Sequence, residues 1–252
     1  MSDRLVGKVA FLAGATSGIG KATAEVFAAE GARVAIAGRR AAEGEAIAES
    51  LRAGGCEAIF VQTDVTDPDN VERSIEATTR EFGRLDILFN NAGGSTPQDG
   101  RVTEAPAEEF WRAVRLDLFG TWNCCRFGIP KLIESGGGSV INMASMVAVA
   151  PTSGRDAYTS AKGGVVALTR SMAREYAEHR IRVNAIAPAA VRTERIAHLV
   201  QTVPGARAIV ERQLLGLIEP AEVAWAAVFL GADESRTLTG QVIAIHGGTF
   251  DP

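Results

Sequence analysis

The sequence contains few cysteines, few histidines and few aromatic residues. Only three of its 252 residues are cysteine, three are histidine, and 6% are aromatic. Cys56 and the adjacent Cys124 and Cys125 offer neither a disulfide framework nor the Cys-x-x-Cys spacing of a zinc site, and the histidines lie far apart. We therefore predict buried or half-buried thiols and no catalytic metal.

Long apolar runs and concentrations of one charge are also missing. The formal net charge is -4, and Lys and Arg are scattered among Asp and Glu without the basic stripe that nucleic acid requires. The first apolar stretch, Val9–Ala13, is too short to span a membrane, and the residues before it do not have the layout of a signal peptide. We expect a soluble, cytoplasmic protein with no nucleic-acid or membrane partner.

Short apolar segments alternate with longer amphipathic segments along the chain, and this alternation predicts an α/β fold. The strand candidates are Val9–Ala13, Arg33–Ala37, Ala58–Val61, Leu85–Phe89, Ser139–Met143, Arg182–Ile186 and Gln241–Ile245. The helix candidates include Lys21–Glu30, Pro68–Phe82, Glu108–Ile133, Ala157–Ala177 and Pro220–Leu230. We predict a doubly wound, seven-stranded parallel sheet flanked by helices, with its ligand at the carboxyl ends of the strands.

The length and the apolar content suit one compact domain, and we place no domain boundary between residues 1 and 252. Residues 189–216 contain no strand candidate. We interpret them as a small helical lid, inserted between the sixth strand and the next crossover helix, that closes over the substrate.

The first predicted strand runs into a glycine-rich turn and then directly into a helix. The turn reads Ala13-Gly14-Ala15-Thr16-Ser17-Gly18-Ile19-Gly20. Glycine lets the backbone approach a pyrophosphate closely, and the helix N-terminus offers unpaired N–H groups and a positive dipole end. This order of elements predicts a dinucleotide-binding site, with a purely structural turn as the alternative.

Further motifs follow this turn in order. They are Asn90-Asn91-Ala92-Gly93, Tyr158-x-x-x-Lys162 and Arg182-Val183-Asn184-Ala185-Ile186-Ala187-Pro188. With the spacing of Gly14, Gly18 and Gly20, they make the chain resemble the short-chain dehydrogenase/reductase family over nearly its whole length. The resemblance implies a Rossmann-type fold and a nicotinamide-dependent oxidoreductase.

The resemblance also implies which residues meet the cofactor. Asp64 and Val65 would border the adenine. Val191 and Thr193 would meet the nicotinamide carboxamide. The residues that would support the central turn of the cofactor are Asn90, Ala92 and Gly93. The full set expected at the cofactor is Gly14, Thr16, Ser17, Gly18, Ile19, Gly20, Arg39, Asp64, Val65, Asn91, Ala92, Gly93, Tyr158, Lys162, Pro188, Val191 and Thr193.

Three side chains form the predicted catalytic group. Tyr158 and Lys162 are four residues apart on a predicted helix and share one face, and the strand before Ser145 brings a hydroxyl to the same cleft. A free tyrosine ionises at about pH 10, so a proton carrier near neutrality needs the positive charge that Lys162 supplies. By the resemblance, Tyr158 transfers the proton, Ser145 polarises the substrate oxygen and Lys162 also holds the nicotinamide ribose. A buried tyrosine and a solvated lysine are the ordinary alternative.

The sequence departs from the family pattern at four positions. Ala13 replaces the usual Thr, Ala189 the usual Gly, and His246 the usual Asp. The fourth is Asp117, where the family's catalytic tetrad has an Asn whose backbone carbonyl holds a water that links the lysine to solvent. An aspartate can keep that backbone contact, but it brings a negative charge toward Lys162. We expect Asp117 in the catalytic group and leave open whether the proton relay survives intact.

The end of the second strand predicts the cofactor. Gly38 stands where an acidic residue would hold the ribose 2′-hydroxyl of NAD, and Arg39 follows it. A guanidinium suits a 2′-phosphate, so we predict that NADP(H) is preferred. Stacking of Arg39 on the adenine would instead leave the preference mild and NAD(H) usable.

The leading hypothesis is hydride transfer between nicotinamide and a secondary alcohol or ketone, with Tyr158 as proton donor or acceptor. The first alternative is reduction of a 3-oxoacyl thioester on an acyl carrier protein. Arg174 would be half of a docking pair for that carrier, but Ser135-Gly136-Gly137-Gly138 lacks the usual basic residue. The second alternative is a catalytically weak cofactor sensor or scaffold.

The sequence leaves two questions about partners. Arg155, Arg192 and Arg195 either meet an anionic substrate or are solvated surface side chains. The helix candidates Glu108–Ile133 and Ala157–Ala177 have apolar residues on more than one face. Because the family pairs such helices across two-fold axes, we expect a homotetramer or otherwise a dimer.

Overall fold

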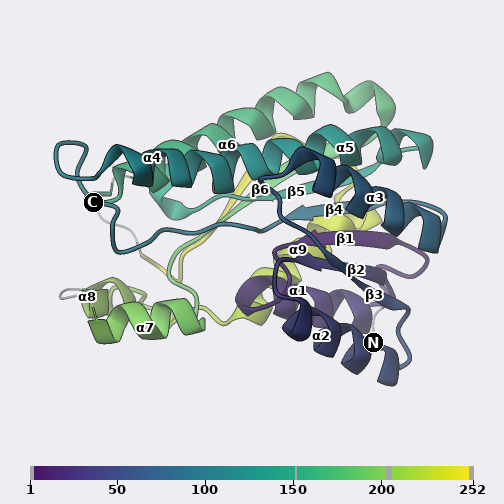
Figure 1. Cartoon of the computed structure of the whole chain (residues 1–252), viewed down its shortest axis with the longest axis horizontal. Helices are drawn as coiled ribbons and strands as arrows, with labels where there is room; N and C mark the ends of the chain where they lie inside the picture. The colour runs from purple at the N-terminus through teal and green to yellow at the C-terminus, as the bar shows by residue number, and fades with distance from the viewer. Residues whose placement is uncertain (1–2, 151, 203–205, 250–252) are drawn as a thin grey trace.

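Seven parallel strands form one sheet in the order β3-β2-β1-β4-β5-β6-β7 (Figure 1). The computed structural model describes residues 3–150, 152–202 and 206–249. The strands are β1 (Val9–Ala13), β2 (Arg33–Gly38), β3 (Ala58–Gln62), β4 (Ile87–Asn90), β5 (Gly138–Met143), β6 (Ile181–Pro188) and β7 (Val242–Ile245). The chain winds outward in one direction from β1 and in the other from β4, which confirms the predicted doubly wound fold.

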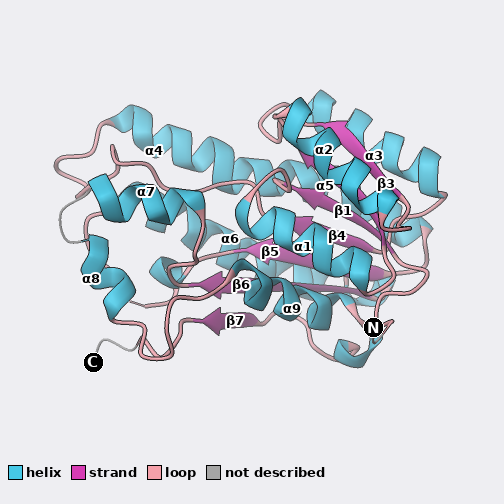
Figure 2. Ribbon diagram, turned by 90° about the horizontal axis from the view of Figure 1, so that it is seen from below, coloured by secondary structure: helices cyan, strands magenta, loops and turns pink. Residues whose placement is uncertain are grey.

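Helices cover both faces of the sheet (Figure 1, Figure 2). One face is covered by α1 (Gly18–Ala29), α2 (Ala41–Ala53) and α9 (Pro220–Gly231), and the other by α3 (Pro68–Phe82), α4 (Ala107–Ala113), α5 (Gly120–Glu134) and α6 (Asp156–Glu175). A parallel sheet covered in this way has buried strands, and every residue of β1 and β4 is buried. Phe27 lies in the apolar cluster on the side of α1, and Phe11 lies in the cluster on the side of α3 and α5.

The limits of α3 follow from single residues at its ends. Asp67 precedes the helix, and its carboxylate accepts hydrogen bonds from the backbone N–H groups of Asp69 and Asn70. Pro68 occupies the first helical position, where its missing N–H costs nothing. Gly83 ends the helix with φ of 79°, a left-handed conformation that favours glycine. The predicted range Pro68–Phe82 is therefore confirmed.

The carboxyl ends of the strands gather the loops that carry the predicted motifs. Ala13 of β1 pairs with Asn90 of β4, so the glycine turn and the loop after β4 leave the sheet next to each other. Two short helices, α7 (Glu194–Thr202) and α8 (Ala206–Glu211), lie at this end of the molecule, within residues 189–216 (Figure 2). The segment predicted as a lid thus contains two helices among its described residues and lies beside the crevice.

Several limits of helices and strands differ by a few residues from the sequence-based prediction, and three differences concern α2, β4 and the helix before Ser135. The helix α2 was not among the expected helices. β4 begins at Ile87 rather than Leu85; Asp86, the residue before it, accepts a hydrogen bond from the Val9 backbone N–H with its carboxylate, at 2.9 Å, and pairs with Arg84. The helix predicted over residues 108–133 is interrupted by a π-helical segment, Val114–Phe119, between α4 and α5. Such a segment has one extra residue per turn and often marks a functional site.

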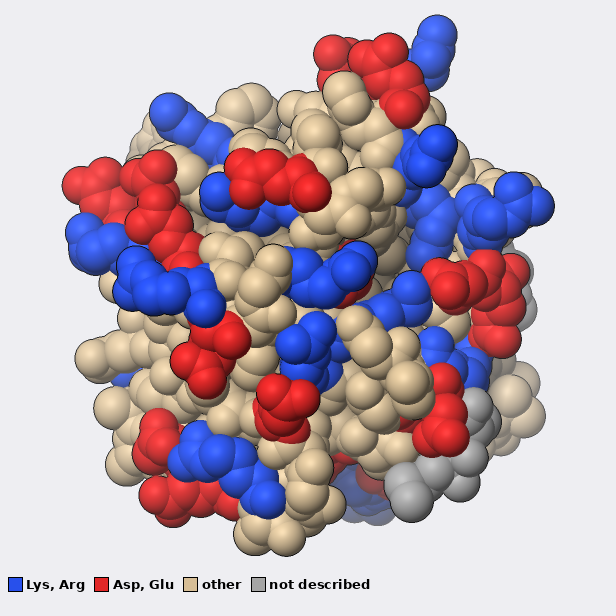
Figure 3. All heavy atoms as spheres, turned by 90° about the vertical axis from the view of Figure 1, so that its right-hand side faces the viewer, with Lys and Arg blue, Asp and Glu red and all other residues tan. Residues whose placement is uncertain are grey.

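The surface shows no concentration of one charge on the face drawn in Figure 3. On this face, basic and acidic side chains lie among one another, as the sequence leads us to expect. Within the described ranges, no helix is long and apolar enough to cross a membrane. The thiols of Cys124 and Cys125 are buried, as predicted, and burial raises the pKa of Cys124 to about 12.

Candidate active site

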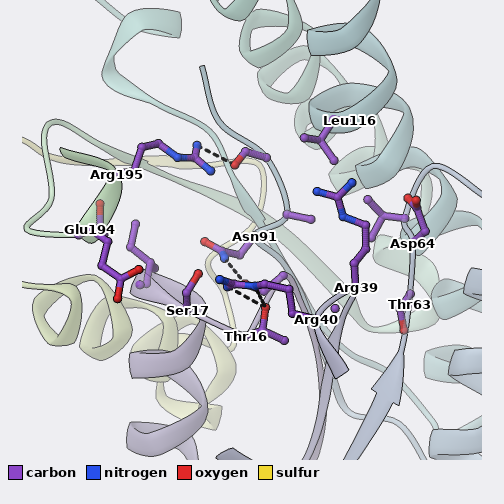
Figure 4. A pocket seen from close by; sticks show the side chains of 18 residues that line it. Thr16, Ser17, Arg39, Arg40, Thr63, Asp64, Asn91, Leu116, Glu194 and Arg195 are labelled. Atoms are coloured by element: carbon purple, nitrogen blue, oxygen red, sulfur yellow. Dashed lines mark hydrogen bonds between the residues drawn. The ribbon is translucent and has the colours of Figure 1, made fainter. Parts of the chain in front are cut away.

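A cavity of about 530 Å³, here called the cofactor cavity, lies at the carboxyl ends of β1, β2, β3 and β4 (Figure 4). This is the point where the winding of the sheet reverses, which is the usual ligand site of a doubly wound fold. The residues of the predicted cofactor set that line it are Gly14, Thr16, Ser17, Gly18, Ile19, Arg39, Asp64, Val65, Asn91, Ala92, Gly93 and Thr193.

Glycine is required at the floor of the cofactor cavity. Gly14 has φ of 76°, and a Cβ atom there would lie 2.6 Å from the Cα of Ala92. Gly18 is the first residue of α1 and has φ of 53°. Bare backbone and the N-terminus of a 12-residue helix thus face the cavity together, which fits the pyrophosphate of a dinucleotide.

Gly20 has a different role from the one predicted. It is not among the residues that line the cavity, and a Cβ atom at this position would lie 2.2 Å from the carbonyl oxygen of Gly14. Gly20 therefore lets α1 pack closely against the glycine turn. It supports the cavity without facing it.

The two asparagines after β4 also separate into different roles. Asn90 is buried and donates a hydrogen bond to Oδ1 of Asn142 at 2.9 Å, so it links β4 to β5 and does not line the cavity. Asn91 lines the cavity and donates to the carbonyl oxygen of Gly14 at 2.8 Å. Asn91 thereby joins the loop after β4 to the glycine turn.

Two arginines from the end of β2 face the cofactor cavity. Arg40 donates two hydrogen bonds to Oγ1 of Thr16, at 3.0 and 3.2 Å. Arg39 also lines the cavity, and its guanidinium has no hydrogen-bond or ion-pair partner within the ranges that the structure describes (Figure 4). The carboxylate of Asp64 accepts hydrogen bonds from the backbone and hydroxyl of Thr66. A guanidinium is therefore available at the edge of the cavity for an anionic group.

A second cavity, of about 330 Å³ and here called the substrate pocket, adjoins the cofactor cavity. Ser145, Tyr158 and Lys162 all line it. The residues that line both cavities are Ile19, Asn91, Gly93, Thr193 and Arg195. Two other predicted cofactor residues, Pro188 and Val191, line the substrate pocket.

Asp99 positions the helix that carries Tyr158. Its carboxylate accepts hydrogen bonds from the backbone N–H groups of Ala157 and Tyr158, at 3.1 and 2.9 Å, and so caps the first turn of α6. Sequence reasoning missed this residue because it precedes the helix by more than fifty positions.

Ser145 follows β5 and is nearly buried. The end of a strand and the start of a helix thus bring the hydroxyl groups of Ser145 and Tyr158 to one pocket.

Lys162 lies beneath the substrate pocket and is held from two sides. Its Nζ donates to the carbonyl oxygen of Met143 at 2.7 Å and lies 3.0 Å from Oδ1 of Asp117. It also lies 5.6 Å from the centre of the Tyr158 ring. Burial opposes the charge on Lys162, but attraction to Asp117 and Tyr158 outweighs it, so the pKa of Lys162 is raised. The ammonium group is therefore retained beside the tyrosine.

Asp117 is fully buried in the π-helical segment. Its Oδ1 also accepts a hydrogen bond from the Gly94 N–H at 2.9 Å, while its Oδ2 has no hydrogen-bond partner within the described ranges. Its backbone carbonyl accepts from the hydroxyl of Thr121 at 2.8 Å. A Cβ atom at Gly93 would lie 2.1 Å from Oδ1 of Asp117. The predicted contact between Asp117 and Lys162 is thus present as a direct, buried ion pair, and Gly93 leaves room for it.

The segment predicted as a lid contributes Thr193 and Arg195 to the lining of both cavities. Arg195, on α7, donates a hydrogen bond from Nη1 to the carbonyl oxygen of Gly93 at 3.0 Å (Figure 4). Sequence reasoning did not predict this contact. It also missed Arg40, Thr63, Leu116 and Glu194, which line the cofactor cavity.

Comparisons with known proteins agree with this arrangement. A family model described as enoyl-(acyl carrier protein) reductase matches residues 14–249. The cis-4-hydroxycyclohexanecarboxylate dehydrogenase of Sinomonas cyclohexanicum is 37% identical over 249 residues, which cover 98% of each chain. The 3-oxoacyl-[acyl-carrier-protein] reductase of Thermotoga maritima is 36% identical over 248 residues, which cover 97% of this chain and 98% of that relative.

A solved structure shows the same fold. The short-chain type dehydrogenase/reductase from Mycobacterium marinum superposes with a TM-score of 0.91 at 32% sequence identity. The match covers 99% of this chain and 98% of that one. The similarity therefore extends over the sheet, both helical layers and the segment beside the crevice.

Proposed function

The chain belongs to the short-chain dehydrogenase/reductase family, and from this premise we propose that it interconverts a secondary alcohol and a ketone with NADP(H) as cofactor. The family implies an enzyme that uses a nicotinamide cofactor, which argues against a cofactor sensor or scaffold. One observation carries the proposal. Ser145, Tyr158 and Lys162 line a pocket that adjoins the cofactor cavity and shares part of its lining.

The three side chains have distinct roles in the proposed reaction. When bound, the nicotinamide ring supplies the acceptor or donor of the hydride. In alcohol oxidation, Ser145 holds the substrate oxygen by a hydrogen bond, and the phenolate of Tyr158 takes the hydroxyl proton as the C–H bond breaks. Lys162 keeps its positive charge beside the tyrosine and stabilises the phenolate. In ketone reduction, Tyr158 returns a proton to the substrate oxygen.

The preference for NADP(H) rests on the end of β2. Gly38 provides no carboxylate to bind a ribose hydroxyl or repel a phosphate, and Arg39 and Arg40 face the cavity. The bonds from Arg40 to Thr16 hold one guanidinium in place, while Arg39 has none within the described ranges. A 2′-phosphate would supply the missing partner through charge-assisted hydrogen bonds.

The proposal includes a homotetramer, or otherwise a dimer, in the cytoplasm. Large apolar side chains on α4 and α5 are exposed, among them Trp111 at 62% and Trp122 at 50%. Pairing with a second copy would bury them. The cysteines Cys56, Cys124 and Cys125 are free thiols, as suits a reducing compartment. Light scattering at micromolar concentration tests the assembly, and a stable monomer would contradict it.

Reduction of a 3-oxoacyl thioester remains the second candidate. The relative from Thermotoga maritima carries that name, and the matching family model is described as a reductase of acyl-carrier-protein substrates. Arg174, the expected half of a docking pair, is exposed at the end of α6. Rapid reduction of acetoacetyl-coenzyme A compared with simple ketones would favour this candidate.

The test is a panel of alcohols and ketones, read by nicotinamide absorbance with both cofactors, on the wild type and on Tyr158→Phe. Loss of the proton carrier should lower kcat by roughly a hundredfold or more while NADPH still binds. Tyr176→Phe makes the same chemical change outside both cavities and should leave kcat unchanged. Full turnover by the Tyr158→Phe variant would overturn the proposal.

A further inference from the structure

The substrate pocket is lined by basic side chains and, among the residues that the structure describes, by no acidic one. Among the described residues, these basic side chains number four. The charge of Lys162 is balanced from behind by Asp117 at 3.0 Å. Arg155, Arg195 and Arg212 also line the pocket. The cofactor cavity differs, because Asp64 and Glu194 line it together with its arginines.

These arginines reach the pocket from separate parts of the chain. Arg155 immediately precedes α6, Arg195 lies on α7, and Arg212 follows α8. Arg155 is half-buried, and its guanidinium has no hydrogen-bond or ion-pair partner within the ranges that the structure describes. Arg195 has one hydrogen bond, to the carbonyl oxygen of Gly93. Both therefore retain donors for a ligand, and a guanidinium presents five N–H donors in a fixed plane.

Arg192 shows what an ordinary surface arginine looks like in the same segment. It forms an ion pair with Glu219 and lines neither cavity. Of the three arginines that the sequence left open, Arg192 is thus a paired surface residue, whereas Arg155 and Arg195 lie in the substrate pocket.

The rest of the pocket lining is largely apolar. Met146 and Val147 contribute from the loop after β5, and Leu199 and Val200 contribute from α7. Arg195 and Leu199 are four residues apart and share one face of α7. A molecule that fills this pocket therefore meets apolar side chains, guanidinium groups and the hydroxyl of Tyr158.

We propose that the substrate is an alcohol or ketone with an apolar body and an anionic group, a carboxylate in the simplest case, remote from the reacting carbon. Arg155 and Arg195 bind that group and determine specificity. This proposal rests on the proposed function, because it assigns the substrate class of the same pocket. A planar guanidinium accepts a carboxylate through two parallel hydrogen bonds, which gives both affinity and orientation.

A binding experiment tests the proposal without requiring turnover. The probes are cyclohexanecarboxylate and the nearly isosteric, neutral cyclohexanecarboxamide, titrated calorimetrically into the enzyme saturated with NADPH. We expect the carboxylate to bind about tenfold more tightly than the carboxamide, and the preference to disappear in Arg155→Gln/Arg195→Gln. Arg192→Gln makes the same kind of substitution at one arginine outside the pocket and should keep the preference. Cyclohexyl phosphate, as a third probe, distinguishes a carboxylate site from a phosphate site.

Each outcome decides the proposal. Equal binding of the acid and the amide, or a preference that survives in the double variant, would overturn it. Tighter binding of the phosphate ester than of the carboxylate would keep the anion site and replace the carboxylate as its occupant. Failure of the proposed function appears separately, as an absence of hydride transfer from any alcohol of the panel while the probes still bind.

Discussion

The cofactor cavity and the substrate pocket adjoin each other at one edge of the sheet, yet they are built differently. The first is shaped by backbone, with Gly14 and Gly18 in left-handed conformations and the N-terminus of α1 facing the cavity. The second is shaped by side chains from the loop after β5, the start of α6 and the lid segment. Backbone geometry therefore fixes which cofactor class binds, whereas substituted side chains can change the substrate without disturbing the fold.

The largest effect, on NADPH affinity, should come from Gly14→Ala, which adds a side chain to the backbone that lines the cofactor cavity. The new Cβ would lie 2.6 Å from the Ala92 Cα, and φ of 76° is unfavourable for alanine. We expect NADPH affinity to fall by roughly a hundredfold, because the loop after β4 must move away from the glycine turn. Fluorescence titration with NADPH measures this loss.

Gly7→Ala is the matched control for this substitution. Gly7 has nearly the same φ, 77°, but a Cβ atom there meets nothing within 4 Å. It should cost about 1 kcal/mol of stability from backbone strain alone and leave NADPH affinity unchanged. Equal losses of affinity in both variants would show that strain, and not the close approach of Ala92, explains the effect.

A smaller effect on cofactor binding should come from Arg39→Ala, which removes one of the side chains that line the cofactor cavity. We expect KM for NADPH to rise about tenfold, since one charge-assisted contact to the 2′-phosphate is lost. KM for NADH should stay the same, which makes the second cofactor an internal control. Steady-state kinetics with both cofactors measure the ratio. A parallel rise in both KM values would mean that Arg39 contacts the adenine and does not discriminate.

The smallest effect, a shift of the pH profile, should come from Asp117→Asn, which changes the buried partner of Lys162. Removing the carboxylate leaves the positive charge of Lys162 without its offset, so the phenolate of Tyr158 is stabilised more strongly. The acidic limb of the pH profile for alcohol oxidation should therefore move to lower pH. Profiles of kcat/KM measure the shift, and a limb that stays in place or moves upward would contradict it.

Stability provides a second readout for the same variant. The pKa of Lys162 is raised in the folded enzyme. Its ion pair therefore contributes fully to folding stability below the pKa of an unfolded lysine, about 10.4, and this contribution is lost as the pH rises through the pKa in the folded state. Asp117→Asn should lower Tm at neutral pH, and the difference should shrink in strong alkali. Asp86→Asn breaks an ion pair at the other end of the sheet and should not move the catalytic limb.

Sequence reasoning predicted the placement of residues where that placement depends on neighbouring positions. The glycine turn and the pair Tyr158 and Lys162 lie within single elements, so their spacing fixes their relative placement. It failed where distant segments converge. Asp99 caps α6 from the loop after β4, and Arg195 reaches Gly93 from the lid segment. No local pattern marks such contacts.

The π-helical segment was missed for another reason. A continuous amphipathic helix is compatible with Val114, Leu116 and Leu118. Their spacing does not indicate an extra residue per turn. Its position depends on the partners of Asp117, which come from Gly94 on one side and Lys162 on the other. Those partners are distant in the sequence, so only the folded chain reveals the interruption.

That interruption also changes the phase of the long helix. One added residue turns every later side chain by about 100° around the axis. As a result, α4 packs on α6, while α5 packs on α3 and on strands β4 and β5. Deleting one residue from Val114–Phe119 would restore regular α-helical winding, but it would rotate one of the two apolar faces away from its neighbour. Substitutions in this stretch should therefore be tolerated far better than insertions or deletions. The active site depends on the length of the stretch as much as on Asp117.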